Sequence, residues 1–171
     1  MTASRISRLL ITVCCTLLFC LVSSSAFAQR APNGFGIGIG AATVAGGLSI
    51  KTGTASGFTF QGVVGPWRGY GPEWRYGADS IAVAGDFLYE QAPLASGGLL
   101  SLGWNYGVGV GAGFGDWGGA VVGVTGVLGL EFNFVPAPID VVLEYRPGLY
   151  IGENDFDIAF WDVTPHIRLW F

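Results

Sequence analysis

Cysteine, basic side chains and long apolar stretches are all scarce in this sequence. Its three cysteines are Cys14, Cys15 and Cys20, so the chain beyond residue 20 has neither a disulfide framework nor thiol chemistry. Eight Lys and Arg residues stand against twelve Asp and Glu residues, with a single histidine. Because nucleic-acid-binding surfaces are basic, this acidic balance argues against a nucleic-acid partner.

The one long apolar run lies near the beginning of the chain, at residues 9–22. It follows Arg5 and Arg8 and is followed by the small-residue motif Ala26-Phe27-Ala28. A positive start, an apolar run and an A-x-A site are typical of a secretory signal peptide. The sequence therefore predicts a signal peptide over residues 1–28, cleaved after Ala28, and one domain over residues 29–171.

Two other interpretations of residues 1–28 remain open. A retained membrane anchor would need about 20 apolar residues, which is more than this run offers. A lipoprotein would begin at Cys20, but the bulky Phe19 stands where lipoprotein sites prefer a small residue. Cleavage after Ala28 removes Arg5 and Arg8, so six basic and twelve acidic side chains remain and the mature chain has a net charge of −6.

Glycine is the residue that the mature chain has in excess. All 29 glycines lie beyond residue 28 and make up about a fifth of the mature residues, where ~7% is usual. The chain is apolar, with a mean hydropathy of +0.52, yet no mature segment offers an unbroken apolar run of about 20 residues. These features together are typical of a transmembrane β-barrel. A water-soluble β-sandwich would need a polar outer face, and polar residues are the sparse set here.

Side chains that alternate between two environments predict eight β-strands. In the first strand, Phe35, Ile37 and Ile39 alternate with glycines, and in the last an apolar face alternates with a polar one. An even count places both chain ends on one side of a barrel, and closure requires the first strand to pair with the last. We therefore predict an all-β, eight-stranded antiparallel transmembrane β-barrel, with ten strands as the alternative. The predicted strands span residues 34–40, 47–52, 57–65, 80–90, 98–111, 120–135, 139–151 and 159–171.

The inward faces of these strands carry charged side chains. An eight-stranded barrel is too narrow for a solvent channel, so side chains fill its interior. Buried charges must be paired or hydrogen-bonded, and we expect a lumen charge network. The alternative is a proton or ion pathway, or a gated pore. The charged inward residues are Lys51, Asp86, Glu90, Glu131, Asp140, Glu144, Arg146, Asp162, His166 and Arg168.

The sequence predicts no catalytic, cofactor or metal site. Small outer-membrane lipid A deacylases use a His-x-Ser arrangement, and here the only histidine, His166, is followed by Arg168 at the serine position. The acidic segment 152–157 is expected to stay solvated and not to bind a divalent cation. The longest loop, residues 66–79, is rich in aromatics that we expect to anchor the protein at a membrane interface, with binding of a glycan, lipid headgroup or protein as the alternative. Its aromatic and basic residues are Trp67, Arg68, Tyr70, Trp74, Arg75 and Tyr76.

Several stretches carry a resemblance to a known family. They are residues 138–149 (PIDVVLEYRPGL), the closing residues 167–171 (IRLWF), residues 35–40 (FGIGIG) and residues 85–89 (GDFLY). The chain resembles a family of small bacterial outer-membrane barrels of OmpA/OmpX-like architecture that has no established activity. Ile167, Leu169 and Phe171 also resemble the C-terminal signal that the barrel-assembly machinery reads. Pro165 departs from a standard strand because it has no N–H.

These observations lead to an expected function and location. We expect a monomer in the bacterial outer membrane, in contact with lipid and lipopolysaccharide, with a structural or surface-interaction role and no enzymatic activity. The first alternative is a narrow channel for small solutes or ions. The second is a lipid-modifying hydrolase.

Overall fold

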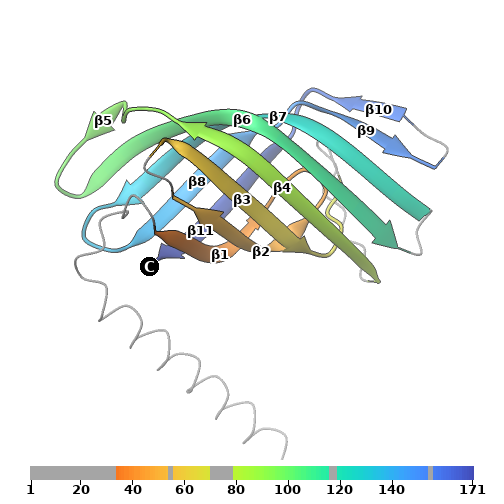
Figure 1. Cartoon of the computed structure of the whole chain (residues 1–171), viewed down its shortest axis with the longest axis horizontal. Helices are drawn as coiled ribbons and strands as arrows, with labels where there is room; N and C mark the ends of the chain where they lie inside the picture. The colour runs from red at the N-terminus through yellow and green to blue at the C-terminus, as the bar shows by residue number, and fades with distance from the viewer. Residues whose placement is uncertain (1–33, 54–55, 70–78, 116–118, 154–155) are drawn as a thin grey trace, which may run out of the picture.

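The protein is an all-β barrel in the computed structural model, which describes residues 34–53, 56–69, 79–115, 119–153 and 156–171. These residues form a closed, antiparallel, eight-stranded barrel and contain no helix, which confirms the predicted all-β barrel (Figure 1). In this part of the chain, no helix has the length and apolarity to cross a membrane. The strands are β1 (Phe35–Ala41), β2 (Gly46–Thr52), β3 (Phe58–Gly65), β4 (Ser80–Glu90), β5 (Ala95–Ser96), β6 (Leu100–Gly115), β7 (Gly119–Phe134), β8 (Ile139–Tyr145), β9 (Gly148–Gly152), β10 (Phe156–Ala159) and β11 (Val163–Trp170).

The barrel closes between the first and last strands, as predicted. Around the wall the order is β1, β2, β3, β4, β6, β7, β8 and β11, and β11 returns to β1. In the closing ladder Ile37 lies opposite Leu169 and Ile39 opposite Ile167. We call the end of the barrel that holds Phe35 and Phe171 the terminal end, and the end that holds the connection between β6 and β7 the far end.

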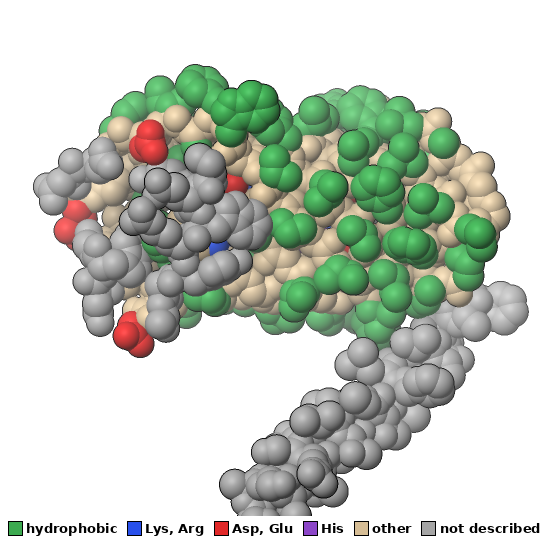
Figure 2. All heavy atoms as spheres, turned by 180° about the vertical axis from the view of Figure 1, so that it is seen from behind, with side chains coloured by type: hydrophobic (Ala, Val, Ile, Leu, Met, Phe, Trp, Pro, Cys, Tyr) green, Lys and Arg blue, Asp and Glu red, His purple; other side chains and the backbone are tan. Residues whose placement is uncertain are grey.

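The side chains alternate between an apolar outside and a polar inside. Ile39 is 66% exposed and Val108 57%, whereas Lys51 and Glu144 are fully buried. Figure 2 shows hydrophobic side chains spread over the outer surface, with the few visible acidic side chains toward one end. The barrel therefore reverses the usual distribution of a water-soluble protein, in which charged residues are almost never fully buried.

Two predicted strands are interrupted in the structure. The segment 139–151 divides into β8 and β9. In the segment 159–171, Ala159 is the last residue of β10, and β11 begins only at Val163. Pro147 has no N–H for the ladder, and at this point the Arg146 N–H donates to the Asp162 carbonyl at 2.8 Å. β9 then pairs with β7 on one side and with β10 on the other. β9 and β10 form a hairpin at the far end (Figure 1). Predicting continuous strands here was wrong.

Other predicted boundaries need correction. The predicted loop 112–119 is largely strand, because β6 continues to Gly115 and β7 begins at Gly119. The glycines of this stretch fit the alternation of a strand, but they have no side chains that would reveal an apolar face. Phe114 continues that face on the outside of the barrel. The predicted acidic loop 152–157 also ends earlier, since Phe156 and Asp157 belong to β10. The predicted turn 91–97 contains β5, a two-residue strand paired with β6.

The connection between β1 and β2 folds into the lumen, which the sequence did not predict. Ala42, Thr43, Val44 and Ala45 are all fully buried. Three of them, Ala42, Val44 and Ala45, join an apolar cluster at the far end that also holds Tyr150 and against which Trp67 packs. Glycines on the inner face make room for this inserted turn, since a Cβ at Gly111 would lie 2.9 Å from Val44 and one at Gly123 would lie 2.8 Å from Thr43. The lumen is thus filled by backbone as well as by side chains.

Candidate functional site in the lumen

The centre of the lumen is built around Arg146. Its guanidinium donates to both carboxylate oxygens of Asp86, at 2.9 and 2.7 Å, and to Glu144 at 2.5 Å. Its Nε donates to the Thr164 hydroxyl at 3.0 Å. All four side chains are buried. A bidentate guanidinium with two carboxylates is a strong, fixed arrangement, and it joins β4, β8 and β11 across the barrel.

His166 extends this cluster toward β2. Its Nε2 lies 2.9 Å from Glu144 Oε2, and its Nδ1 lies 3.0 Å from the Ser49 hydroxyl. Ser49 lies on a different strand from His166, so a His-x-Ser pattern on one strand does not reveal it. The neighbouring pairs β11–β1 and β1–β2 bring the two side chains together. A Cβ at Gly40 would lie 2.1 Å from Nδ1, so glycine is what leaves space for the imidazole ring.

The order hydroxyl, imidazole and carboxylate is also that of a serine-hydrolase relay. Such a relay needs a hydroxyl that a substrate carbonyl can reach and donors for the oxyanion. Ser49 is fully buried, and Glu144 already accepts hydrogen bonds from Arg146 and Gln61. The arrangement as it stands satisfies buried polar groups of three strands.

Arg168 and Gln61 form a second part of the network, nearer the terminal end. Arg168 donates from Nε to Asp140 at 3.1 Å and from Nη1 to the Gln61 carbonyl oxygen. Gln61 in turn donates to Asp86 at 2.8 Å, which links this part to the central cluster. The Trp170 indole N–H also donates to Asp140, at 2.9 Å. Within the described chain, Arg168 Nη2 is a buried group with no hydrogen-bond partner.

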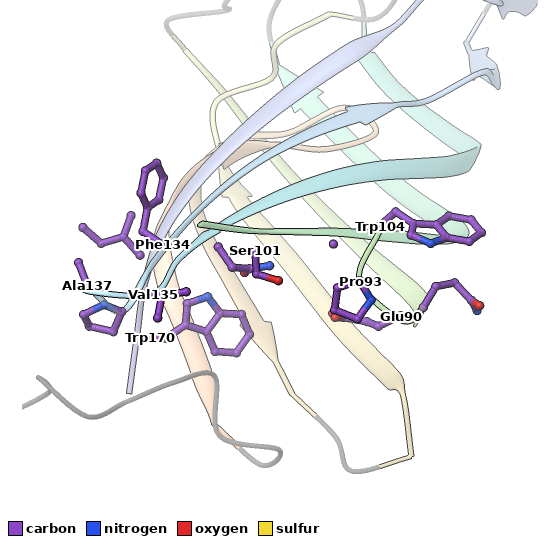
Figure 3. Close-up of a pocket in the computed structure, with 13 residues that line it drawn as sticks. Glu90, Pro93, Ser101, Trp104, Phe134, Val135, Ala137 and Trp170 are labelled. Atoms are coloured by element: carbon purple, nitrogen blue, oxygen red, sulfur yellow. The ribbon is translucent and has the colours of Figure 1, made fainter. Parts of the chain in front are cut away.

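Lys51 holds the network at the terminal end. Its ammonium lies 2.8 Å from Glu90 and also contacts Glu131, which accepts a hydrogen bond from Asn105 at 2.5 Å. Beside this group is a cavity of about 200 Å³. Figure 3 shows Glu90, Ser101, Trp104 and Trp170 around it.

Arg68 seals the far end. Its guanidinium pairs with Asp162 through contacts of 3.1 and 2.6 Å, and its Nε donates to the Ala42 carbonyl at 2.7 Å. Its backbone N–H donates to the Val44 carbonyl at 3.1 Å, so one residue holds both the inserted turn and the wall. The Tyr150 hydroxyl also donates to Asp162, at 3.3 Å.

The interpretation of the aromatic residues of the long loop as an interface anchor was wrong for Trp67, and the basic Arg68 beside it lies inside the barrel. Arg68 is fully buried in the lumen, and Trp67 packs against the apolar cluster of the far end. Arg68 lies in a loop, where side chains do not alternate with a fixed period, so its inward direction could not be inferred from the sequence. Tyr70, Trp74, Arg75 and Tyr76 lie outside the described residues.

The structure places every charged residue of the predicted network on the inner side of the wall. All are buried except Glu90, whose side chain is 17% exposed. They are joined by Arg68, a charged residue that the predicted network lacked, and by the uncharged Ser49, Gln61, Asn105 and Tyr150. Among the described residues, no three His, Cys, Asp or Glu side chains gather as they would around a metal ion. Asp155 of the acidic segment lies outside these residues.

Comparison with known proteins adds no relative. No protein-family model, curated protein or solved structure matches this chain. The resemblance to small outer-membrane barrels is therefore supported at the level of barrel architecture, and function must be argued from the barrel itself.

Proposed function

We propose that this protein is a small integral outer-membrane β-barrel, exported with a signal peptide that is cleaved after Ala28. Its role is structural or one of surface interaction, without enzymatic activity. The observation that carries the proposal is the reversed polarity of the wall. Lys51, Glu144 and Arg146 are fully buried, while Ile39 and Val108 are among the large apolar side chains left exposed around the barrel.

A lipid bilayer is the solvent that suits such a surface. Water-soluble monomers rarely expose a continuous apolar patch of more than a few hundred Å². In hydrocarbon no water is present to satisfy backbone groups, so a spanning sheet must close on itself, as β1 and β11 do here. Phe35 and Phe171 stack at 5.5 Å where this seam meets the terminal end, which suits assembly through the last strand.

The interior favours a sealed barrel over a channel. Arg146 spans the middle of the lumen with two carboxylates, and the inserted turn closes the far end. The cavity at the terminal end is the observation that favours the alternative, a narrow channel. The Ser49–His166–Glu144 arrangement is the observation that favours a lipid-modifying hydrolase. Outer-membrane lipid and lipopolysaccharide are the partners that the apolar wall would meet, and one closed chain needs no second copy.

The membrane assignment is tested by heat-modifiable gel mobility of the protein extracted from membranes. We expect the unheated protein to migrate differently from the boiled protein, because a closed barrel resists SDS until it is heated. Absence of a shift, together with release of the protein into the soluble periplasm, would refute the assignment.

Planar-bilayer recording tests the sealed lumen. We expect no steady single-channel steps from the purified protein, and such steps would favour the channel. Mass spectra of lipid A from cells with and without the protein test the hydrolase, for which a changed acyl pattern is required.

A further inference from the structure

The cavity at the terminal end has walls of two different kinds. Its volume is about 200 Å³, and it lies between the connection that follows β4 and the connection between β7 and β8. Pro93 and Val135 belong to an apolar rim (Figure 3). Glu90, Ser101 and Asn133 add oxygen and nitrogen atoms to the wall. Cavities that bind small molecules are mostly apolar with a few convergent polar groups, and this cavity has that composition.

Asn133 brings an amide to the cavity. It lies on the inner side of β7, opposite Ser101 of β6. Within the described chain, the Asn133 side chain makes no hydrogen bond. A Cβ at Gly103 would lie 3.3 Å from Asn133 Nδ2, so the glycine leaves the space in front of the amide open. Because an amide has two N–H donors and a carbonyl acceptor, Asn133 can both donate to a ligand and accept from it.

Trp170 offers the face of its ring to the cavity. Its indole N–H donates to Asp140 at 2.9 Å, which fixes the orientation of the ring. On the neighbouring strand β1, a Cβ at Gly36 would lie 2.9 Å from the ring, so glycine makes room for it. The indole lines the cavity beside Ser101 (Figure 3). A tryptophan held in this way provides a rigid apolar surface on which a ring can stack.

These walls select a ligand by its chemistry. A purely apolar molecule would leave the Asn133 amide without a hydrogen-bond partner, which costs free energy. An anion would lie against the Glu90 carboxylate and be repelled. A sugar ring has apolar C–H faces that can lie on an indole, and hydroxyl groups around its edge that pair with amides and carboxylates. Because drug-sized ligands occupy pockets of about 300–1,000 Å³, the smaller volume here fits a single ring.

We propose that the terminal-end cavity binds one uncharged sugar unit. Its ring stacks on Trp170, and its hydroxyl groups form hydrogen bonds with Asn133, Ser101 and Glu90. This gives the surface-interaction role a chemical class of partner. It rests on the proposed function, because that role requires a folded barrel that presents its terminal end to water.

Binding is tested by saturation-transfer NMR of the mature protein, folded in micelles of a zwitterionic detergent. The probes are N-acetylglucosamine and methyl β-glucoside, with glucuronate as the charged counterpart. We expect saturation transfer to the ring protons of at least one of the two uncharged sugars and far less to glucuronate. Absence of transfer to both uncharged sugars, or equal transfer to glucuronate, would overturn the proposal.

The place of binding is tested with Gly103→Val, which fills the space in front of the Asn133 amide. We expect saturation transfer to fall at least tenfold. The matched control is Gly126→Val on the outer side of β7, where a Cβ would meet nothing closer than Pro147 at 3.8 Å, and transfer should persist. Both proteins are first shown to fold by heat-modifiable mobility. Undiminished transfer to folded Gly103→Val would refute the assignment of the site.

Asn133→Leu tests the amide without filling the cavity, and it serves also where Gly103→Val does not fold. The side chain keeps its volume and loses its hydrogen-bonding groups, so the dissociation constant of the sugar should rise about fivefold. An unchanged dissociation constant would contradict the role of Asn133. Loss of heat-modifiable mobility from the wild type would refute the barrel assignment, whereas a folded barrel without saturation transfer would overturn sugar binding alone.

Discussion

The two ends of the lumen are closed by different kinds of contact. At the far end an inserted turn is held by Arg68, which pairs one to one with Asp162. At the terminal end a cavity of about 200 Å³ remains, beside a lysine that two carboxylates share. The far end is therefore filled by a turn of the chain itself, whereas a cavity remains at the terminal end. Loss of a contact should cost more stability at the far end than at the terminal end.

The largest effect is expected at Arg146, where the two halves of the lumen meet. Arg146→Met leaves Asp86 and Glu144 facing each other in a buried site, and loss of one partner from a buried ion pair costs about 3–5 kcal/mol. We expect this variant to lose heat-modifiable mobility or to unfold at much lower urea concentration. Arg146→Lys keeps the positive charge without the two-pronged geometry. Its stability should lie between those of Arg146→Met and the wild type. Wild-type stability of Arg146→Met would show that the two halves are not coupled through this residue.

Arg68→Gln distinguishes the two ends more sharply. It leaves Asp162 buried without its cation and frees the carbonyls of the inserted turn, so a loss of roughly 2–4 kcal/mol is expected. Released from the lumen, the turn should become accessible to protease added to the folded protein in micelles, which should cut the chain between β1 and β2. Lys51→Met, its counterpart at the terminal end, should lower stability without exposing this turn. Cleavage of the turn in both variants, or in neither, would contradict the assignment of the far-end seal to Arg68.

The strands and the inserted turn also differ in how far the sequence alone could predict them. Strand faces followed from a period of 2, because outward-facing residues such as Phe35 and Ile39 alternate with inward-facing glycines. The inserted turn has no such period, and its inward direction depends on packing between strands far apart in the chain. Its trace in the sequence is indirect and lies in Gly111 and Gly123, which leave room for it. Pro147 lies at the break between β8 and β9 and is a sequence signal for it. The alternation of apolar residues continues on both sides of the proline, and for this reason the segment was predicted as one strand.

A bulky side chain on the inner wall should destabilise the far end, because it would occupy space that the inserted turn and Tyr150 now fill. At Gly123 a Cβ would lie 2.7 Å from the Tyr150 ring, so Gly123→Val should cost about 1–3 kcal/mol through overpacking. Gly126→Val is the matched control on the same strand, since its Cβ would meet nothing closer than Pro147 at 3.8 Å. Urea unfolding followed by tryptophan fluorescence compares the two. Equal losses would mean that the space on the inner wall, and the turn that occupies it, does not determine the effect.

The smallest effect is expected from a hydrogen bond between a side chain of the inserted turn and one of β7. The hydroxyls of Thr43 and Thr125 lie 3.0 Å apart, and both residues are buried. Thr43→Val keeps the shape of the side chain but leaves the Thr125 hydroxyl without that partner, which should cost about 1 kcal/mol. Thr43→Val combined with Thr125→Val removes both polar groups and should recover most of that loss. Urea midpoints of the three proteins provide the measurement. If the double variant loses as much as the sum of two single losses, the turn is held by something other than this hydroxyl pair, and Arg68 would have to carry the contact between the turn and the wall.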